Sequence, residues 1–173
     1  DCSQTILERC KEDRSIERKP AGYSPRDLSV YLSMWANTPI DGGIIVIGMA
    51  DNGQFEGCSG LSQTQLNELE KTGVVYCPDA RFSTKRISVI RKNGTQDFVL
   101  VFRVYYRQEK VVETTAGEAY VRNGDSKKKL TQEEIRELQI DKGQVSFENE
   151  PCGLNYPDDF DLDLVKKFSD AVR

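Results

Sequence analysis

The sequence predicts an α+β fold with a mixed sheet, hairpins and several helices, and three observations lead to this class. A helical pattern occupies residues 24–38, a continuous apolar run follows at residues 44–49, and Asn-Gly pairs stand at the ends of strand-like segments. Helices and strands do not alternate regularly, as they would in a parallel α/β sheet. With 173 residues, of which 38% are hydrophobic, the chain is long enough for one ordinary core.

The first strongly predicted helix begins at Ser24, a favoured N-cap, with Pro25 at the first helical position. Apolar residues at helical spacing form one face, which includes Tyr31 and Trp35, and we expect both rings to lie in the core. The helix is predicted to end near residues 37–39. The apolar run that follows is too short and too continuous for a surface helix, so it predicts a central strand covered on both faces.

A functional site could be formed by the loop before this strand and the turn after it. We expect Asn37, Gly42 and Gly43 to shape the loop between the helix and the strand. The Asn-Gly pair that follows Asp51 favours a tight hairpin turn, which would leave the Asp51 carboxylate at the end of the strand.

Further elements follow from capping and turn patterns. Ser62 and Gln65 form a capping box for a helix that we expect Gly73 to end. Residues 86–91 and 98–104 flank an Asn-Gly pair, which predicts a second hairpin.

A shorter strand pair is predicted at residues 111–113 and 119–122. Thr131 and Glu134 form another capping box, which opens a helix with Ile135 and Leu138 facing inward.

The composition changes after residue 142. We interpret residues 1–142 as one domain, and residues 143–173 as a linker followed by the first helix of a further, truncated domain. The five cysteines are widely spaced and odd in number, which indicates reduced thiols rather than a disulfide framework. The longest apolar stretch is too short for a membrane span. We therefore expect a soluble, cytoplasmic protein that does not bind membranes.

The residue inventory excludes several classes of enzyme. The chain has no histidine, so neither a histidine-dependent nucleophile nor a histidine-ligated metal is available. No phosphate-binding P-loop pattern is present, and Gly42 and Gly43 lead into a strand rather than into a helix. Carboxylate chemistry, lysine or arginine chemistry, and binding remain, and no cofactor is expected for binding.

The net charge of −4 conceals a basic middle third. Residues 81–129 carry 12 basic and 5 acidic side chains, whereas residues 1–80 carry 7 basic and 12 acidic ones. A basic sheet face that contacts nucleic-acid phosphates would explain this segregation, and a solvated face with edge lysines is the structural alternative. The residues that we expect to contact phosphates are Lys19, Arg86, Arg91, Arg103, Arg122, Lys127, Lys128 and Lys129. One ring of the Tyr105-Tyr106 pair is expected to lie on the sheet face beside Arg103.

Three carboxylates offer a second possibility. Strand alternation from residue 15 places Glu17 and Lys19 on one face of a predicted strand. If that strand lies beside the central one, Glu12, Glu17 and Asp51 could converge as oxygen ligands for Mg²⁺ or Mn²⁺ and activate water against a phosphodiester. Surface ion pairs are the structural alternative for these residues.

Three blocks of the sequence resemble the Schlafen AlbA-type domain in order and spacing. They are Ser15–Pro20, then Trp35–Gly48 with Asp51–Gly53 and Gly57, then Ala119–Ser126 followed by the Leu130–Leu138 helix. Together they span roughly residues 8–140. The resemblance implies a DNA-binding domain of the kind found in bacterial transcriptional regulators, where further C-terminal domains are common.

The resemblance also implies an alternative, because related domains in Schlafen proteins cleave tRNA and rRNA with three carboxylates. These would correspond here to Glu12, Glu17 and Asp51, with Mg²⁺ or Mn²⁺. This chain has Ala50 where the regulators often have another acid, and one lobe where the nucleases have two; a homodimer would restore a two-lobed groove. We therefore favour nucleic-acid binding, with DNA preferred to RNA, over a metal-dependent endoribonuclease.

Overall fold

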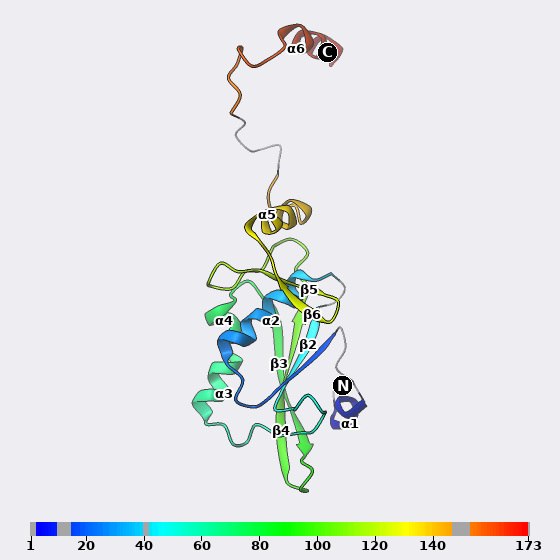
Figure 1. Ribbon diagram of the computed structural model, residues 1–173, viewed down its shortest axis with the longest axis vertical. Helices are drawn as coiled ribbons and strands as arrows, with labels where there is room; N and C mark the ends of the chain where they lie inside the picture. Colours follow the sequence, from blue (N-terminus) through cyan, green and yellow to red (C-terminus); the bar gives the residue numbers. More distant parts are fainter. Residues whose placement is uncertain (1–2, 10–14, 40–41, 147–152, 173) are drawn as a thin grey trace.

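The computed structural model describes residues 3–9, 15–39, 42–146 and 153–172, and Figure 1 shows its elements in chain order. These elements are α1 (Gln4–Arg9), β1 (Ile16–Lys19), α2 (Pro25–Asn37), β2 (Gly43–Ile47), α3 (Gln63–Glu70), α4 (Thr72–Tyr76), β3 (Arg81–Ile90), β4 (Gln96–Tyr105), β5 (Tyr120–Asn123), β6 (Ser126–Lys129), α5 (Gln132–Asp141) and α6 (Leu162–Ala171). A mixed four-stranded sheet has the order β1-β2-β4-β3, and β5 pairs with β6 in a separate two-stranded sheet. The α+β class predicted from the sequence is confirmed.

Strand alternation gives the four-stranded sheet two different faces. The front face carries Ile45 and Phe102, which lie opposite each other on β2 and β4, and α2 covers this face with the buried ring of Trp35. The back face carries Val46 and Val101, which are also cross-strand partners. Because both faces of β2 are buried, the prediction of a central, doubly covered strand is confirmed.

Helix α2 forms as its sequence predicts. The Ser24 side chain accepts a hydrogen bond from the Asp27 backbone N–H, and Pro25 occupies the start of the helix, where no N–H donor is needed. At the other end, the Thr38 N–H and hydroxyl both donate to the Met34 carbonyl. Trp35 is only 1% exposed, so its assignment to the core is confirmed.

Close packing explains both glycines of the loop that precedes β2. Gly42 has a φ of 71°, and a Cβ built on it would lie 2.0 Å from the Val104 carbonyl oxygen. A Cβ on Gly43 would lie 2.1 Å from Cε2 of Trp35. The glycine pair therefore allows β2 to approach both β4 and the indole ring.

The sequence misplaced the end of the helix that starts after Ser62. The capping box with Gln65 is present, but α3 ends at Glu70, and Gly73 lies inside the following helix α4 instead of ending α3. A Cβ on Gly73 would lie 2.0 Å from Cε1 of Phe82, so packing against β3 requires this glycine.

The partner of β5 also differs from the prediction. Residues 120–123 pair with β6, whereas residues 111–113 contribute only an isolated bridge between Glu113 and Ala119. The physical reason is the tight turn through Gly124, whose φ of 61° suits a two-residue hairpin loop and favours the nearer partner strand.

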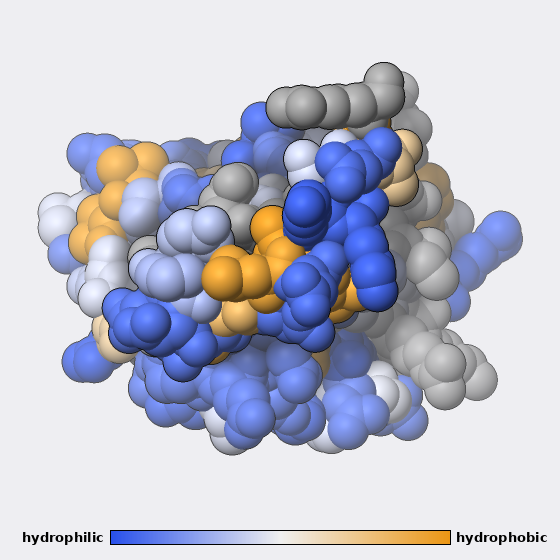
Figure 2. Space-filling model, turned by 90° about the horizontal axis from the view of Figure 1, so that it is seen from above, coloured by the Kyte–Doolittle hydropathy of each residue, from blue (hydrophilic) through white to orange (hydrophobic). Residues whose placement is uncertain are grey.

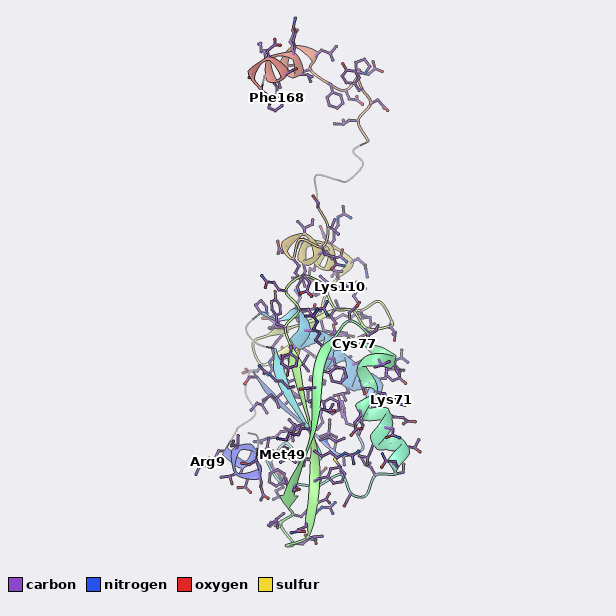
Figure 3. The ribbon with its side chains drawn as sticks, turned by 180° about the vertical axis from the view of Figure 1, so that it is seen from behind. Arg9, Met49, Lys71, Cys77, Lys110 and Phe168 are labelled. Atoms are coloured by element: carbon purple, nitrogen blue, oxygen red, sulfur yellow. The ribbon has the colours of Figure 1, made fainter. Side chains whose placement is uncertain are left out.

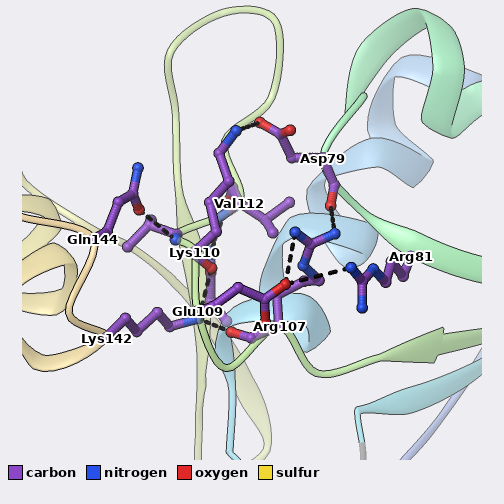
Figure 4. Close-up of polar contacts among 10 residues, drawn as sticks. Asp79, Arg81, Arg107, Glu109, Lys110, Val112, Lys142 and Gln144 are labelled. Carbon is purple, nitrogen blue, oxygen red and sulfur yellow. Dashed lines mark hydrogen bonds and ion pairs between the residues drawn. The ribbon is translucent and has the colours of Figure 1, made fainter.

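The C-terminal part begins with α5, which has the predicted capping box and buries Ile135. Lys142 and Gln144 attach the end of α5 to the loop after β4 (Figure 4), because the Lys142 ammonium donates to the carbonyls of Arg107 and Lys110. Gln144 Oε1 accepts from the Val111 N–H at 2.8 Å, so contacts with the domain continue two residues past the boundary expected at 142.

Helix α6 buries no residue, and it lies at the end of the molecule in Figures 1 and 3, where Phe168 is labelled. Figure 2, viewed from this end, shows hydrophobic surface exposed among hydrophilic residues. Among the described residues, no helix is long and apolar enough to cross a membrane.

Candidate nucleic-acid interface

The carboxylate of Glu17 lies between two cations on the front face. Glu17 and Lys19 are opposite Ile45 and Ile47 in the parallel pairing of β1 with β2, so both side chains point toward α2, as alternation predicted. The Glu17 Oε1 atom lies 2.5 Å from the Lys19 Nζ, and Oε2 lies 3.4 Å from Nη1 of Arg122. The Glu17, Lys19 and Arg122 side chains are 12%, 15% and 7% exposed, so these ion pairs are largely shielded from water.

Aromatic rings of α2 form the floor beneath these cations. The Lys19 Nζ lies 5.1 Å and the Lys127 Nζ 4.9 Å from the ring centroid of Tyr31, so two ammonium groups share one ring. The Arg122 guanidinium lies 5.9 Å from the ring centroid of Trp35. We call Glu17, Lys19, Tyr31, Arg122 and Lys127 the front cluster.

The electrostatics of the front cluster keep its tyrosine neutral. Burial raises the pKa of Tyr31 to about 12, and the neighbouring charge of Glu17 contributes in the same direction. Tyr23, whose ring centroid lies 6.3 Å from that of Tyr31, also has its pKa raised to about 12, mainly by burial. Both rings therefore remain neutral contact surfaces for cations at physiological pH.

Two residues at the end of α2 hold β5, and with it Arg122, against the helix. The buried Asn37 side chain donates to the carbonyls of Val112 at 2.8 Å and Tyr120 at 3.2 Å, and it accepts from the Val112 N–H. The Thr38 hydroxyl accepts from the Arg122 N–H at 2.8 Å. Asn37 therefore joins α2 to the segments that carry Val112 and Tyr120, and its expected role in shaping the loop stays a prediction. Sequence reasoning missed Thr38.

A hollow of about 330 Å³ adjoins the front cluster at the same end of the sheet. It is lined by Arg122 and Trp35, together with the two glycines Gly42 and Gly124. Ser15, Thr38 and Pro39 complete the lining. The hollow is of a size that admits a small polar group such as a phosphate or a base.

The three consecutive lysines of β6 differ in their partners. Lys128 pairs with Glu134 and Lys129 pairs with Glu118. These contacts hold the pKa of both glutamates below its usual range, chiefly through the lysine hydrogen bonds. Within the described part of the chain, Lys127 forms no ion pair and instead points at the Tyr31 ring. Of the three, Lys127 is therefore the one placed to meet an outside anion.

The remaining predicted phosphate contacts do not all lie on the face of the front cluster. Arg86 lies on the front face beside α3 and pairs with Glu70 at 3.0 Å. Arg103 lies opposite Ser83 on the back face, because it is three positions along β4 from Leu100, the partner of Arg86, and an odd step changes the face. The structure thus divides the basic residues over two faces, where a single basic sheet face was expected.

Arg91 has a structural partner near the tip of the β3–β4 hairpin. It pairs with Asp97, whose side chain is fully buried and also accepts from the Ser59 hydroxyl and N–H. Burial alone would raise the pKa of Asp97, but hydrogen bonds from Ser59 and Phe98 and the Arg91 charge together lower it. Arg91 therefore has a structural role, because it forms an ion pair with a buried carboxylate.

Of the three candidate carboxylates, Glu12 lies outside the residues that the structure describes. Asp51 is exposed in the turn after β2, and its backbone carbonyl accepts from Nη1 of Arg18 at 3.1 Å. Glu17 has both oxygens turned to cations. Within the ranges that the structure describes, no group of three or more Asp, Glu or Cys side chains is arranged to hold a metal ion.

The sequence matches the protein family described as "Schlafen, AlbA_2" over residues 12–131. Among solved structures, the fold is similar to that of the DIP2311 protein from Corynebacterium diphtheriae, with a TM-score of 0.53 and 21% sequence identity. That similarity covers 80% of this chain and 31% of the DIP2311 chain, so the matched part corresponds to less than a third of the length of that protein. No protein of curated function matches the sequence.

Proposed function

The chain belongs to the Schlafen AlbA_2 family, and from this premise we propose that it is the nucleic-acid-binding module of a cytoplasmic regulator, with DNA preferred to RNA. The front cluster supplies the phosphate contacts. This assignment replaces the single basic sheet face with a smaller surface formed by β1, α2 and the β5–β6 hairpin.

The observation that carries the proposal is the excess of positive charge in the front cluster. Lys19, Arg122 and Lys127 converge there, and within the part of the chain that the structure describes, three positive charges meet the one negative charge of Glu17. Cations gathered beside a hollow attract anions, and phosphates are the anions that nucleic acids present.

Pre-organisation supports the same function. The ring of Tyr31 fixes the ammonium groups of Lys19 and Lys127, and a cation above a ring gains about 0.5–1 kcal/mol at an exposed site. Thr38 fixes the backbone of Arg122. Less side-chain entropy is then lost when a phosphate binds, because the donors already have defined positions.

The metal-dependent endoribonuclease remains the competing candidate, and the donor set argues against it. A hard divalent cation requires carboxylate oxygens that are open to it. The two oxygens of Glu17 instead face an ammonium and a guanidinium group, and the Asp51 side chain is exposed in a turn. The described residues therefore fit an anion better than they fit Mg²⁺ or Mn²⁺.

One titration separates the two candidates. Labelled duplex DNA and tRNA are each titrated at low and moderate salt, with and without Mn²⁺, and the nucleic acid is checked for cleavage. We expect binding that weakens steeply with salt, favours the duplex and does not depend on Mn²⁺. Cleavage of tRNA that requires Mn²⁺ and is abolished by Glu17→Ala would establish the nuclease instead.

A further inference from the structure

The back face of the sheet changes character along its length. Toward the β3–β4 hairpin, Val89 and Val99 are buried beneath Leu7 of α1 and the loop that carries Phe55. Toward the opposite end, no described residue is buried over Tyr105 in the same way, and its ring is 45% exposed. An aromatic ring thus lies open on one end of a sheet whose other end is covered.

Charged and polar side chains surround this ring. Strand pairing places Ser83 opposite Arg103 and Arg81 opposite Tyr105, and Lys85 follows on the same face of β3. We call Arg81, Ser83, Lys85, Arg103 and Tyr105 the back-face patch. It lies on the face opposite to α2, so the sheet separates it from the front cluster.

The Tyr105 ring has a defined position. Its hydroxyl lies 3.2 Å from the Ser83 hydroxyl, and the Arg103 guanidinium lies 5.8 Å from the ring centroid. The neighbouring Tyr106 ring is turned elsewhere and packs beneath the Lys142 ammonium, 4.7 Å from its centroid. The structure thus decides which ring of the tyrosine pair lies on the sheet face.

The charge of the patch is positive. Arg81 and Arg103 contribute cations, and among the described residues Glu109 pairs with Arg81 at 3.5 Å. This pair is weak, because the two side chains are 65% and 55% exposed and water screens the attraction. A phosphate could compete with Glu109 for Arg81 at little cost.

We propose that the back-face patch binds single-stranded nucleic acid, with a base stacked on Tyr105 and the adjoining phosphates bound by Arg81 and Arg103. Exposed aromatic rings flanked by cations on a sheet bind unpaired bases, because every base presents a flat π face, whereas a duplex hides its bases in the stack. An acidic peptide would use the cations but would gain little from the ring. The proposal rests on the proposed function and extends it to a second surface and a second form of ligand.

The test compares a labelled single strand of oligothymidylate with a duplex of mixed sequence. Tyr105→Ala is expected to weaken single-strand binding at least about fivefold, since loss of one stacking ring has effects of this order. Tyr105→Phe is expected to retain wild-type affinity, and duplex binding is expected to be unchanged in both variants. Tyr156→Ala, which removes a ring that is 71% exposed in the C-terminal segment, is the matched control.

The outcomes separate this inference from the proposed function. If wild type and Tyr105→Ala bind the single strand equally, the stacking site is refuted while salt-dependent duplex binding still stands. If polyglutamate displaces the single strand as well as unlabelled oligothymidylate does, the patch is a general acidic-ligand surface and the inference fails. If the wild-type protein binds neither nucleic acid, both proposals fall. Thermal melting of each variant confirms that the fold is intact.

Discussion

The guanidinium of Arg122 lies 3.4 Å from the carboxylate of Glu17 and thereby ties the β5–β6 hairpin to strand β1. The two residues are 105 positions apart in the chain, yet both side chains are more than four-fifths buried. Glu17 also pairs with Lys19, so a single carboxylate balances cations from two elements of the structure. The contact thus joins β1 to the β5–β6 hairpin, and the aromatic rings of α2 lie beneath both cations.

Replacement of Glu17 by Gln is expected to destabilise the fold. It removes the negative charge that Lys19 and Arg122 share in a site shielded from water, and we expect a loss of about 2 kcal/mol in the free energy of unfolding. Urea unfolding provides the measurement. The double variant with Arg122→Gln should lose less than the sum of the single losses, because the residues interact directly. Strictly additive losses would show that they do not.

Asn37→Ala is expected to have a larger effect. The Asn37 side chain is 1% exposed and exchanges hydrogen bonds with Val112 and Tyr120. Its removal leaves buried backbone groups unsatisfied, so we expect a loss of about 3 kcal/mol. Asn67→Ala on the exposed surface of α3 is the control and should change stability by less than about 0.5 kcal/mol. Equal melting temperatures for the two variants would contradict the role assigned to Asn37.

Gly43→Ala tests the close approach of β2 to the indole ring. The new Cβ would lie 2.1 Å from Trp35, so the ring must shift within a packed core, at an expected cost of about 1–3 kcal/mol. Trp35 is the single tryptophan of the chain, so its fluorescence reports the displacement directly. Gly22→Ala, whose Cβ would meet nothing within 4 Å, should leave both spectrum and stability unchanged.

Asp97 is expected to make stability depend on acid pH. Its pKa is lowered in the folded state from an ordinary value of 3.8. Asp97 of the unfolded chain therefore binds a proton at a higher pH than Asp97 of the folded protein does. As the pH falls, the free energy of unfolding decreases. Asp97→Asn should be less stable at neutral pH and should lack this part of the acid loss. Unfolding of both proteins at neutral and acid pH checks the expectation, and parallel curves would contradict it.

Local patterns predicted much of the fold. Caps and spacing identified α2, α3 and α5, and the apolar run identified β2, because those signals depend on residues close together in the chain. The role of Gly73 was misjudged, since its reason for being glycine is the ring of Phe82 on another element. The partner of β5 was misjudged because the choice lay between two nearby segments and depended on the turn at Gly124.

The candidate site was predictable in residue type but not in arrangement. Alternation correctly placed Glu17 beside Lys19. It could not show that Arg122 would join them, because this contact depends on how the β5–β6 hairpin packs on α2. Nor could the sequence distinguish Lys127 from Lys128, since the difference lies in the nearby Glu134 of α5 and the Tyr31 ring of α2.

The front cluster is tested most directly by the salt dependence of duplex DNA binding. The measurement compares wild type with Lys127→Gln and Lys128→Gln. Three phosphate contacts predict that wild-type affinity falls roughly 40-fold over a fourfold rise in salt. Lys127→Gln should bind more weakly, with a slope reduced by about one, whereas Lys128→Gln should resemble wild type because Lys128 already pairs with Glu134. Wild-type affinity that does not change with salt, or equal effects of the two substitutions, would contradict phosphate binding at the front cluster.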